Sequence, residues 1–211
     1  MRKRFNFTIL IYIVLGVSFL AGIYLIVYPY LPEIKYQLFD KNKTVVPYPS
    51  VVEKQIKDEG KKGNKDIVVE QKEIPKDNRL VIPSIGVDIA IVEGSTENTL
   101  NKGAWRIPGT GKPGISNMVI AGHRMSYGFS ADEIRSKLSF YHLDKLLEGE
   151  YVLIYWEGKE YPYIVTETKI VEPTQLEIEA PTKEHILTLY TCTPMGTGNQ
   201  RLVKIAKPVA I

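Results

Sequence analysis

Hydrophobic and polar positions follow three different patterns along the chain. Residues 9–27 are apolar except for two tyrosines, one serine and two glycines, and they carry no charge. Residues 32–78 mix lysine, aspartate and glutamate with proline and glycine, so they offer no continuous face to bury. From residue 79 onward, short runs of valine, isoleucine, threonine and tyrosine alternate with turn residues, as in β-strands. The pattern predicts a helix, a solvated tether and a mainly β domain.

The first part is long enough to span a membrane. About 20 apolar residues cross a bilayer as a helix, and the basic residues at 2–4 favour a cytoplasmic amino end. A cleaved signal peptide is the alternative, but it usually has a shorter apolar core and a small-residue cleavage site, which residues 25–32 lack. We therefore interpret residues 1–31 as a cytoplasmic cap and an uncleaved signal-anchor. Residues 32–78 then form an extracellular tether with a reach of roughly 40 Å. The chain is expected to be a single-pass protein of the cell membrane, with the domain over 79–211 outside.

Strand patterns and turns divide this last part into short elements. Glu157-Gly158 is a strong hairpin signal. Helical or turn segments are predicted over 130–139 and 140–147. Strands are predicted over 79–93 (two strands across a Pro-Ser bend), 117–121, 150–156, 159–168, 186–192 and 202–205. Many short strands with few helices favour a closed or nearly closed β-barrel.

Composition and charge exclude several classes of function. Hydrophobic residues make up 44% of the chain, enough for a core, and the net charge is only +3. No basic stripe or basic run with interleaved aromatic residues indicates a nucleic-acid partner. The single cysteine excludes an intramolecular disulfide and a multi-cysteine metal site. The three histidines lie far apart and without ligand spacing, so the sequence predicts no metal and no cofactor.

The single cysteine, Cys192, lies where a predicted strand ends and a loop begins. Pro194 and Gly196 interrupt the strand pattern just after it, and Arg201 stands where the chain enters the next strand. If these strands pair, Cys192 and Arg201 lie at the same rim of the sheet. A fixed cation beside a thiol favours the thiolate, which is the nucleophilic form. The alternative is that a lone cysteine serves as a small buried apolar residue.

His123 is the histidine best placed for chemistry. It follows an apolar strand directly, so it can face a cleft at the rim and exchange protons near neutral pH. His142 and His185 are most simply surface or packing residues. Cys192, His123 and Arg201 therefore make a candidate site with three members.

These segments resemble the sortase family. Residues 188–192, Thr-Leu-Tyr-Thr-Cys, look like the Thr-Leu-x-Thr-Cys signature of that family. Gly122-His123 after an apolar strand and Arg201-Leu-Val on the next strand match the other two catalytic segments in order. The similarity covers roughly residues 79–207. It implies the eight-stranded sortase β-barrel with short helices, with a groove above the Cys–His–Arg rim.

The resemblance also implies a reaction, that of a cysteine transpeptidase of the cysteine endopeptidase class on the outer face of a Gram-positive-type envelope. Cys192 as a thiolate would attack the Thr–Gly carbonyl of an LPxTG-like sorting signal. Arg201 would hold the substrate backbone or the developing oxyanion, and His123 would protonate the leaving amine. The thioester would pass to an amine, either on a cell-wall peptidoglycan precursor or on a pilin lysine. The implied partners are surface proteins with a C-terminal sorting signal.

The motif positions further imply that Thr191, Thr193 and Arg124 bind substrate. The run over 121–128 resembles class E or class D sortases most. The Thr-Pro pair after the cysteine resembles pilin-assembling class C members, but we find neither the Asp-Pro-aromatic lid nor the C-terminal membrane span of that class. Class A members can bind calcium through carboxylates; the glutamates between 172 and 179 are the nearest equivalent, and we interpret them as a solvated loop.

Two positions depart from the family pattern. Lys204 replaces the usual apolar residue after Arg-Leu-Val, and its place opposite Val203 and Ile205 predicts a solvent-facing side chain. The segment 131–139 is longer than the family pattern suggests and predicts an extra helix beside the groove.

Two other functions fit part of the pattern. A thiol hydrolase would use water as the acceptor, so added amines would not change its product. A non-catalytic, tethered extracellular binding module would have an inert thiol, and Cys192→Ala would leave its role intact. The presence of all three catalytic residue types weighs against the binding module.

Overall fold

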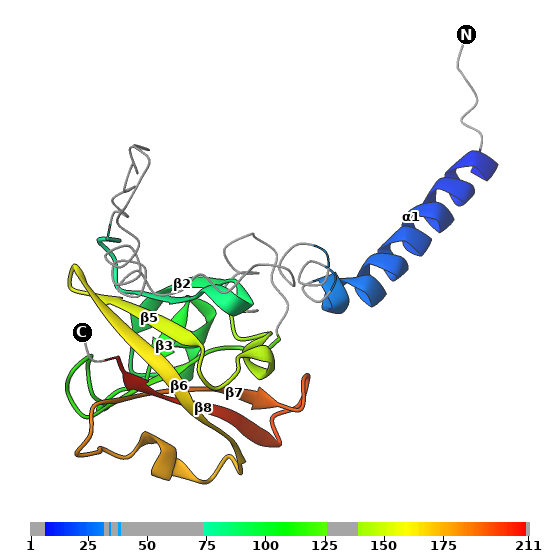
Figure 1. The fold of residues 1–211 in the computed structure, drawn as a ribbon. Coiled ribbons are helices and arrows are strands. Elements are labelled where there is room, and N and C mark those ends of the chain that lie inside the picture. The colour runs from blue at the N-terminus through cyan, green and yellow to red at the C-terminus, as the bar shows by residue number, and fades with distance from the viewer. Residues whose placement is uncertain (1–6, 32–33, 35–37, 39–73, 126–138, 210–211) are drawn as a thin grey trace, which may run out of the picture. The chain divides into compact units, whose positions relative to one another are not determined.

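The computed structural model describes residues 7–31, 34, 38, 74–125 and 139–209 (Figure 1). The chain divides into two compact units, an N-terminal helical unit and a β unit. Almost all of the predicted tether lies outside the described residues, and so does the predicted helix over 130–139 apart from Ser139.

Helix α1 (Phe7–Val27) matches the predicted apolar span. Its side chains are hydrophobic around the whole circumference, a pattern found in buried helices and in membrane spans. Residues Leu10–Val27 are long and apolar enough to cross a membrane, and none of this segment is buried inside the protein. A 3-10 turn, η1 (Tyr28–Tyr30), follows; it contains Pro29, which has no N–H to continue the α-helix.

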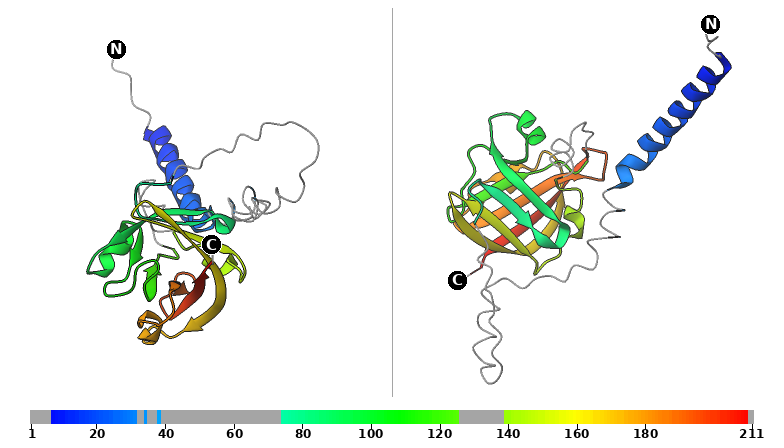
Figure 2. Two further views of the ribbon diagram at one scale, coloured as in Figure 1. Left: turned by 60° about the vertical axis from the view of Figure 1, so that its left-hand side comes forward. Right: turned by 90° about the horizontal axis from the view of Figure 1, so that it is seen from above.

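The β unit is a closed barrel of eight strands, which confirms the predicted fold class (Figures 1 and 2). Around the barrel the order is β1-β2-β3-β4-β7-β8-β6-β5, and β5 pairs with β1 to close it. The strands are β1 (Arg79–Ile82), β2 (Val87–Glu93), β3 (Ala104–Arg106), β4 (Asn117–Ala121), β5 (Tyr151–Trp156), β6 (Lys159–Val171), β7 (Ile186–Thr193) and β8 (Gln200–Pro208). Short 3-10 turns connect them: η3 (Pro83–Ile85), η4 (Glu97–Asn101), η5 (Leu143–Lys145) and η6 (Leu176–Glu179).

Local turn chemistry accounts for the hairpins that the sequence predicted. Between β5 and β6, Glu157 and Gly158 both have positive φ angles, 51° and 72°, the conformation of a tight hairpin turn. The Asn78 side chain accepts a hydrogen bond from the Glu157 amide at 2.8 Å, which holds the turn against the start of β1. The bend between β1 and β2 ends on Gly86, at φ 67°.

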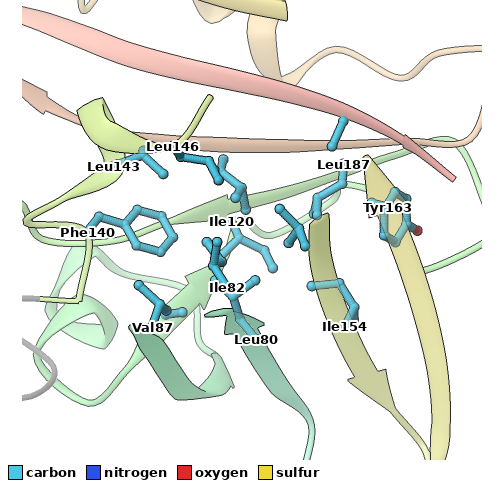
Figure 3. Packing of buried hydrophobic residues seen from close by; sticks show 14 of the residues in the cluster. Leu80, Ile82, Val87, Ile120, Phe140, Leu143, Leu146, Ile154, Tyr163 and Leu187 are labelled. Atoms are coloured by element: carbon cyan, nitrogen blue, oxygen red, sulfur yellow. The ribbon is translucent and has the colours of Figure 1, made fainter. Parts of the chain in front are cut away.

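The barrel interior holds the main hydrophobic core. Alternate residues of each strand point inward, and the side chains of Leu80, Ile120, Ile154 and Leu187 are fully buried there. Figure 3 shows that the turn segment after residue 139 also contributes to this core, through Phe140, Leu143 and Leu146. The predicted helical or turn character of 140–147 is thus realised as turns around η5, fixed by apolar anchors.

A second, smaller cluster lies on the outside of the barrel wall. Val119 and Ala121 of β4 pack there with Leu100 and Ile107, and Trp105 and Tyr190 lie against them. Both faces of β4 are therefore buried, with Met118 and Ile120 facing the interior. This alternation identifies which residues of β4 and β7 face inward and which face outward.

The prediction of a solvent-facing Lys204 is wrong. Lys204 does lie on the face opposite Val203 and Ile205, but that face lines the barrel interior, and Lys204 is 3% exposed. Its Nζ donates to the Leu146 carbonyl oxygen and, at 3.0 Å, to Thr168 Oγ1. The sequence pattern identified two faces but could not tell which one would line the interior of the closed barrel.

Candidate active site

His123 lies two residues past the end of β4, beside the end of β7. The two strands are parallel neighbours, with Ala121 paired to Tyr190. The Gly122 amide donates to the Tyr190 carbonyl oxygen at 3.2 Å, so the pairing continues one residue past the end of β4. By this register, the next residues along the two strands are His123 and Cys192.

Cys192 and Arg201 are direct partners in the antiparallel β7–β8 ladder, which confirms that they share a rim. Strand alternation places Cys192 on the same outward face as Tyr190, which packs in the outer cluster. Arg201 lies on that face too, because Leu202 next to it points into the core. Cys192 and Arg201 thus lie on one face, and His123 lies beside Cys192 where the pairing of β4 with β7 continues past Gly122.

Gly122 allows the turn at His123 to fit against the core. A side-chain carbon at Gly122 would lie 2.6 Å from the ring of Phe140, closer than real contacts allow. The Phe140 amide donates to the His123 carbonyl oxygen at 2.9 Å, so the backbone of His123 is held from the same side. The glycine of the Gly-His motif is therefore needed for close approach of backbone and ring.

Arg201 is half-buried and is oriented by the loop between β7 and β8. Its Nη1 donates to the Gly198 carbonyl oxygen at 3.0 Å and to its neighbour Gln200 at 3.2 Å. The Gln200 side chain in turn donates to Glu172 Oε1 at 3.1 Å, which connects the start of β8 to the end of β6. The cation is thus held at the rim beside Cys192, which is itself half-buried.

The three predicted substrate-binding residues have partners inside the protein. The Thr191 hydroxyl, which is buried, donates to the Gly122 carbonyl oxygen at 2.7 Å. Arg124 Nη1 donates to Thr193 Oγ1 at 2.8 Å, and both residues are buried. These contacts tie the exit of β4 to the end of β7, on the side of the sheet opposite Cys192.

A feature that sequence reasoning missed is the anchoring of the connection between β6 and β7. The buried Asn117 side chain donates to the carbonyl oxygens of Ile178 and Ala180, at 2.9 and 3.2 Å. The Tyr190 hydroxyl donates to Glu179 Oε1 at 2.7 Å. Burial, together with this carboxylate, raises the pKa of Tyr190 far above its usual range. The signal in the sequence was a tyrosine two residues before the cysteine, on the same face.

The remaining histidines and the loop glutamates lie apart from this arrangement. His142 is buried with its ring edge-on to Tyr141, and His185 is exposed. Within the described ranges, no three or more His, Cys, Asp or Glu side chains group as metal ligands would. Glu172 and Glu179 instead accept hydrogen bonds from Gln200 and Tyr190.

The geometry defines a class of protein: a β-barrel with a thiol, an imidazole and a guanidinium on neighbouring strand ends. A family model described as the sortase domain matches residues 80–209. The chain belongs to the sortase family, whose members are cysteine transpeptidases; the comparisons do not determine its subclass.

Two relatives and three solved structures show how far the similarity extends. The chain is 28% identical to sortase A of Bacillus anthracis over 59% of its own length and 56% of the relative's. It is 27% identical to sortase A of Listeria monocytogenes over 61% of its length and 54% of the relative's. The chain therefore spans about half the length of these curated relatives.

Among solved structures, sortase C1 of GBS pilus island 1 is similar with a TM-score of 0.55 and 30% identity, covering 64% of each chain. A Clostridium perfringens sortase D5 transpeptidase has a TM-score of 0.55 and 25% identity, covering 78% of this chain and 91% of that one. A lid mutant of sortase A from Corynebacterium diphtheriae has a TM-score of 0.56 and 25% identity, covering 68% and 75%. Neighbours from three sortase classes thus share this barrel.

Proposed function

We propose that this protein is a membrane-anchored cysteine transpeptidase. It cleaves an LPxTG-like sorting signal on a substrate protein and transfers that substrate protein to an amine. The observation that carries the proposal is the strand register: Cys192 pairs with Arg201 across β7 and β8, and His123 follows the end of β4 beside Cys192. A nucleophile, a proton carrier and a fixed cation within one rim are the parts that acyl transfer needs.

The first half of the reaction forms a thioester. The Cys192 thiolate attacks the carbonyl carbon of the scissile Thr–Gly bond, and the carbonyl electron pair moves to oxygen. Arg201 stabilises that oxyanion, or the adjacent substrate backbone, by charge-assisted hydrogen bonds. His123 donates a proton to the glycine nitrogen as the C–N bond breaks, so the leaving group departs as a neutral amine.

The second half transfers the acyl group. His123 accepts a proton from the incoming amine, the amine nitrogen attacks the thioester carbonyl, and the Cys192 thiolate leaves. The acceptor is an amine on a peptidoglycan precursor or a pilin lysine, and the donor is a surface protein with a C-terminal sorting signal. The same steps with water in place of the amine would give hydrolysis.

The proposal gives Thr191, Thr193 and Arg124, the predicted substrate-binding residues, an indirect part in substrate binding. The internal hydrogen bonds of their side chains place them directly beneath the rim, where they support the backbone that the substrate meets. The connection between β6 and β7, held by Asn117 and Tyr190, supplies a wall on the outward face next to Cys192.

The N-terminal unit sets the proposed location. Helix α1 anchors the protein in the cell membrane as a single span, residues 32–78 act as the extracellular tether, and the catalytic domain over 79–211 lies outside. The composition and length of the helix support the anchor. The basic residues before it support the orientation.

The test uses the full chain in detergent micelles, a panel of sorting-signal peptides, and triglycine or a lysine derivative as the amine. We expect a peptide thioester on Cys192 by mass spectrometry, and an amine-linked product that depends on the added amine. Cys192→Ala should abolish both, while a control change at the exposed His185, His185→Ala, should leave both unchanged. A product that amines do not alter would indicate the hydrolase instead. No adduct with any peptide would overturn the proposal and favour a binding module.

A further inference from the structure

A layer of polar contacts lies directly beneath the proposed catalytic rim. Arg124 follows His123 beyond the end of β4, and Thr193 follows Cys192 in β7, so each proposed catalytic residue has one of them as its neighbour in sequence. These two neighbours bond to each other, from Arg124 Nη1 to Thr193 Oγ1 at 2.8 Å. One side-chain contact thus joins the backbone positions next to the proposed acid–base group and the nucleophile.

The other end of Arg124 is anchored as well. Its Nη2 lies 3.2 Å from Asp144 Oδ1, and the Arg124 side chain is only 10% exposed. Asp144 belongs to η5, whose neighbours Leu143 and Leu146 are fully buried in the core. The carboxylate therefore comes from a fixed segment, and it balances the charge of a guanidinium that has little water around it.

The position of Thr193 at the end of β7 explains why its hydrogen bond with Arg124 matters. Thr193 is the last residue of β7, and the next residue, Pro194, has no amide hydrogen to extend the ladder. The loop after it, from 194 to 199, is exposed. The ends of strands open most easily where a ladder stops, and Cys192 stands one residue before that stop.

We propose that Arg124 is a positioning residue for the transpeptidation reaction, which fixes the spacing of His123 and Cys192 by clamping Thr193 to Asp144. This inference rests on the proposed function. It assigns Arg124 a role through Thr193 rather than a direct contact with the peptide, because its Nη1 and Nη2 atoms are paired with Thr193 and Asp144 inside the protein and its Nε is buried without a partner.

A merely structural role is the alternative, and Arg106 provides a matched control. Its side chain is 14% exposed and pairs with Glu93, and its Nη1 donates to the Thr110 and Gly111 carbonyl oxygens. Arg106 belongs to β3, and its side-chain partners, which also include the ring of Trp156, lie outside the proposed site. Arg106→Gln thus removes a half-buried arginine with a similar set of partners, without touching the clamp.

The experiment compares Arg124→Gln, Arg124→Lys, Thr193→Val and Arg106→Gln in the full-length protein. Two readouts are measured: kcat and KM with the best sorting-signal peptide, and the rate of Cys192 alkylation by iodoacetamide as a function of pH. We expect Arg124→Gln to lower kcat by about 100-fold with KM nearly unchanged, and to change the alkylation profile from that of the wild type. Arg124→Lys should also have a lower kcat, because a single ammonium group cannot bond to Thr193 and Asp144 with the planar geometry of a guanidinium. Arg106→Gln should retain the wild-type kcat and alkylation profile.

Several results would overturn the inference. One is a fall in kcat for Arg106→Gln as large as that for Arg124→Gln at equal thermal destabilisation. Another is an unchanged kcat and alkylation profile in folded Arg124→Gln. If Arg124→Gln does not fold, Thr193→Val decides, since it keeps the Arg124–Asp144 pair and removes only the clamp: a wild-type profile would then refute the role. If the wild-type protein forms no thioester with any peptide, the proposed function fails, while the alkylation profiles still report whether Arg124 sets the state of Cys192.

Discussion

Cys192 and Arg201 face each other as paired residues of the β7–β8 ladder. Directly opposed residues in an antiparallel pair have Cβ atoms about 5 Å apart and point to the same side of the sheet. The loop carbonyl oxygens of Gly198 and Gln200 orient the guanidinium of Arg201. The cation beside the thiol is therefore a consequence of strand register, and it is in place before any substrate arrives.

Gly122→Ala tests how tightly the His123 turn is packed. The added methyl group would lie 2.6 Å from the Phe140 ring, so the strand exit or the ring must move. We expect a loss of about 1–3 kcal/mol in the free energy of unfolding and a fall in kcat, because His123 is the next residue. Urea unfolding and steady-state kinetics measure the two effects. Gly198→Ala, where the added methyl meets nothing within 4 Å, is the control for stability. Equal stabilities of the two variants would contradict the packing argument.

Lys204→Met tests the buried lysine through the pH dependence of stability. Burial lowers the pKa of Lys204 in the folded protein below its usual value of 10.5. Between the two pKa values the unfolded chain binds more protons than the folded one, so the contribution of Lys204 to stability rises with pH in that window.

We therefore expect the free energy of unfolding of the wild type to rise relative to that of Lys204→Met as the pH approaches 10.5. Urea unfolding of both proteins at a series of pH values from 7 upward measures the difference. A difference that is independent of pH would show that the Lys204 pKa is the same in both states.

Tyr190→Phe tests the hydrogen bond from β7 to η6, between Tyr190 and Glu179. The variant loses the hydrogen bond to Glu179, so we expect a destabilisation of about 1.5 kcal/mol and a higher KM for peptide. Because the pKa of Tyr190 is raised in the folded state, its contribution to stability is complete below the usual tyrosine pKa of about 10 and declines as the pH rises above it. Tyr190→Phe should thus lose less stability than the wild type at alkaline pH. Identical alkaline unfolding curves would refute this assignment.

Asn117→Ala tests how β4 anchors the connection between β6 and β7. The side chain is 2% exposed, donates to Ile178 and Ala180, and accepts from Thr188 Oγ1 at 2.8 Å. Its removal leaves buried partners unpaired, so we expect a loss of about 2–3 kcal/mol and faster amide hydrogen exchange around η6. Thr188→Val removes only the threonine bond and is the matched control. Equal exchange rates at η6 in Asn117→Ala and Thr188→Val would show that Asn117 does not hold the connection.

Much of the fold and the rim could be inferred from local patterning. The hairpin at Glu157-Gly158 and the strand over 117–121 depend on turn preferences and alternation within a few residues, so they can be predicted from the sequence. Cys192 and Arg201 are separated by one short loop, and their pairing follows once that loop returns the chain antiparallel. His123 is proposed as their partner because it follows an apolar strand directly, and the likeness of three motifs to a known family supports that choice.

Closure of the barrel determined which residues far apart in the sequence come into contact. Alternation placed Lys204 opposite Val203, but only closure of the barrel turned the face of Lys204 toward the interior. The Arg124–Thr193 contact joins residues far apart in sequence, and it exists because β4 and β7 are parallel neighbours. Such contacts depend on which strands meet and in which register. That choice is made by burial summed over the whole barrel, whereas turns and strand periods are set by residues that are close along the chain.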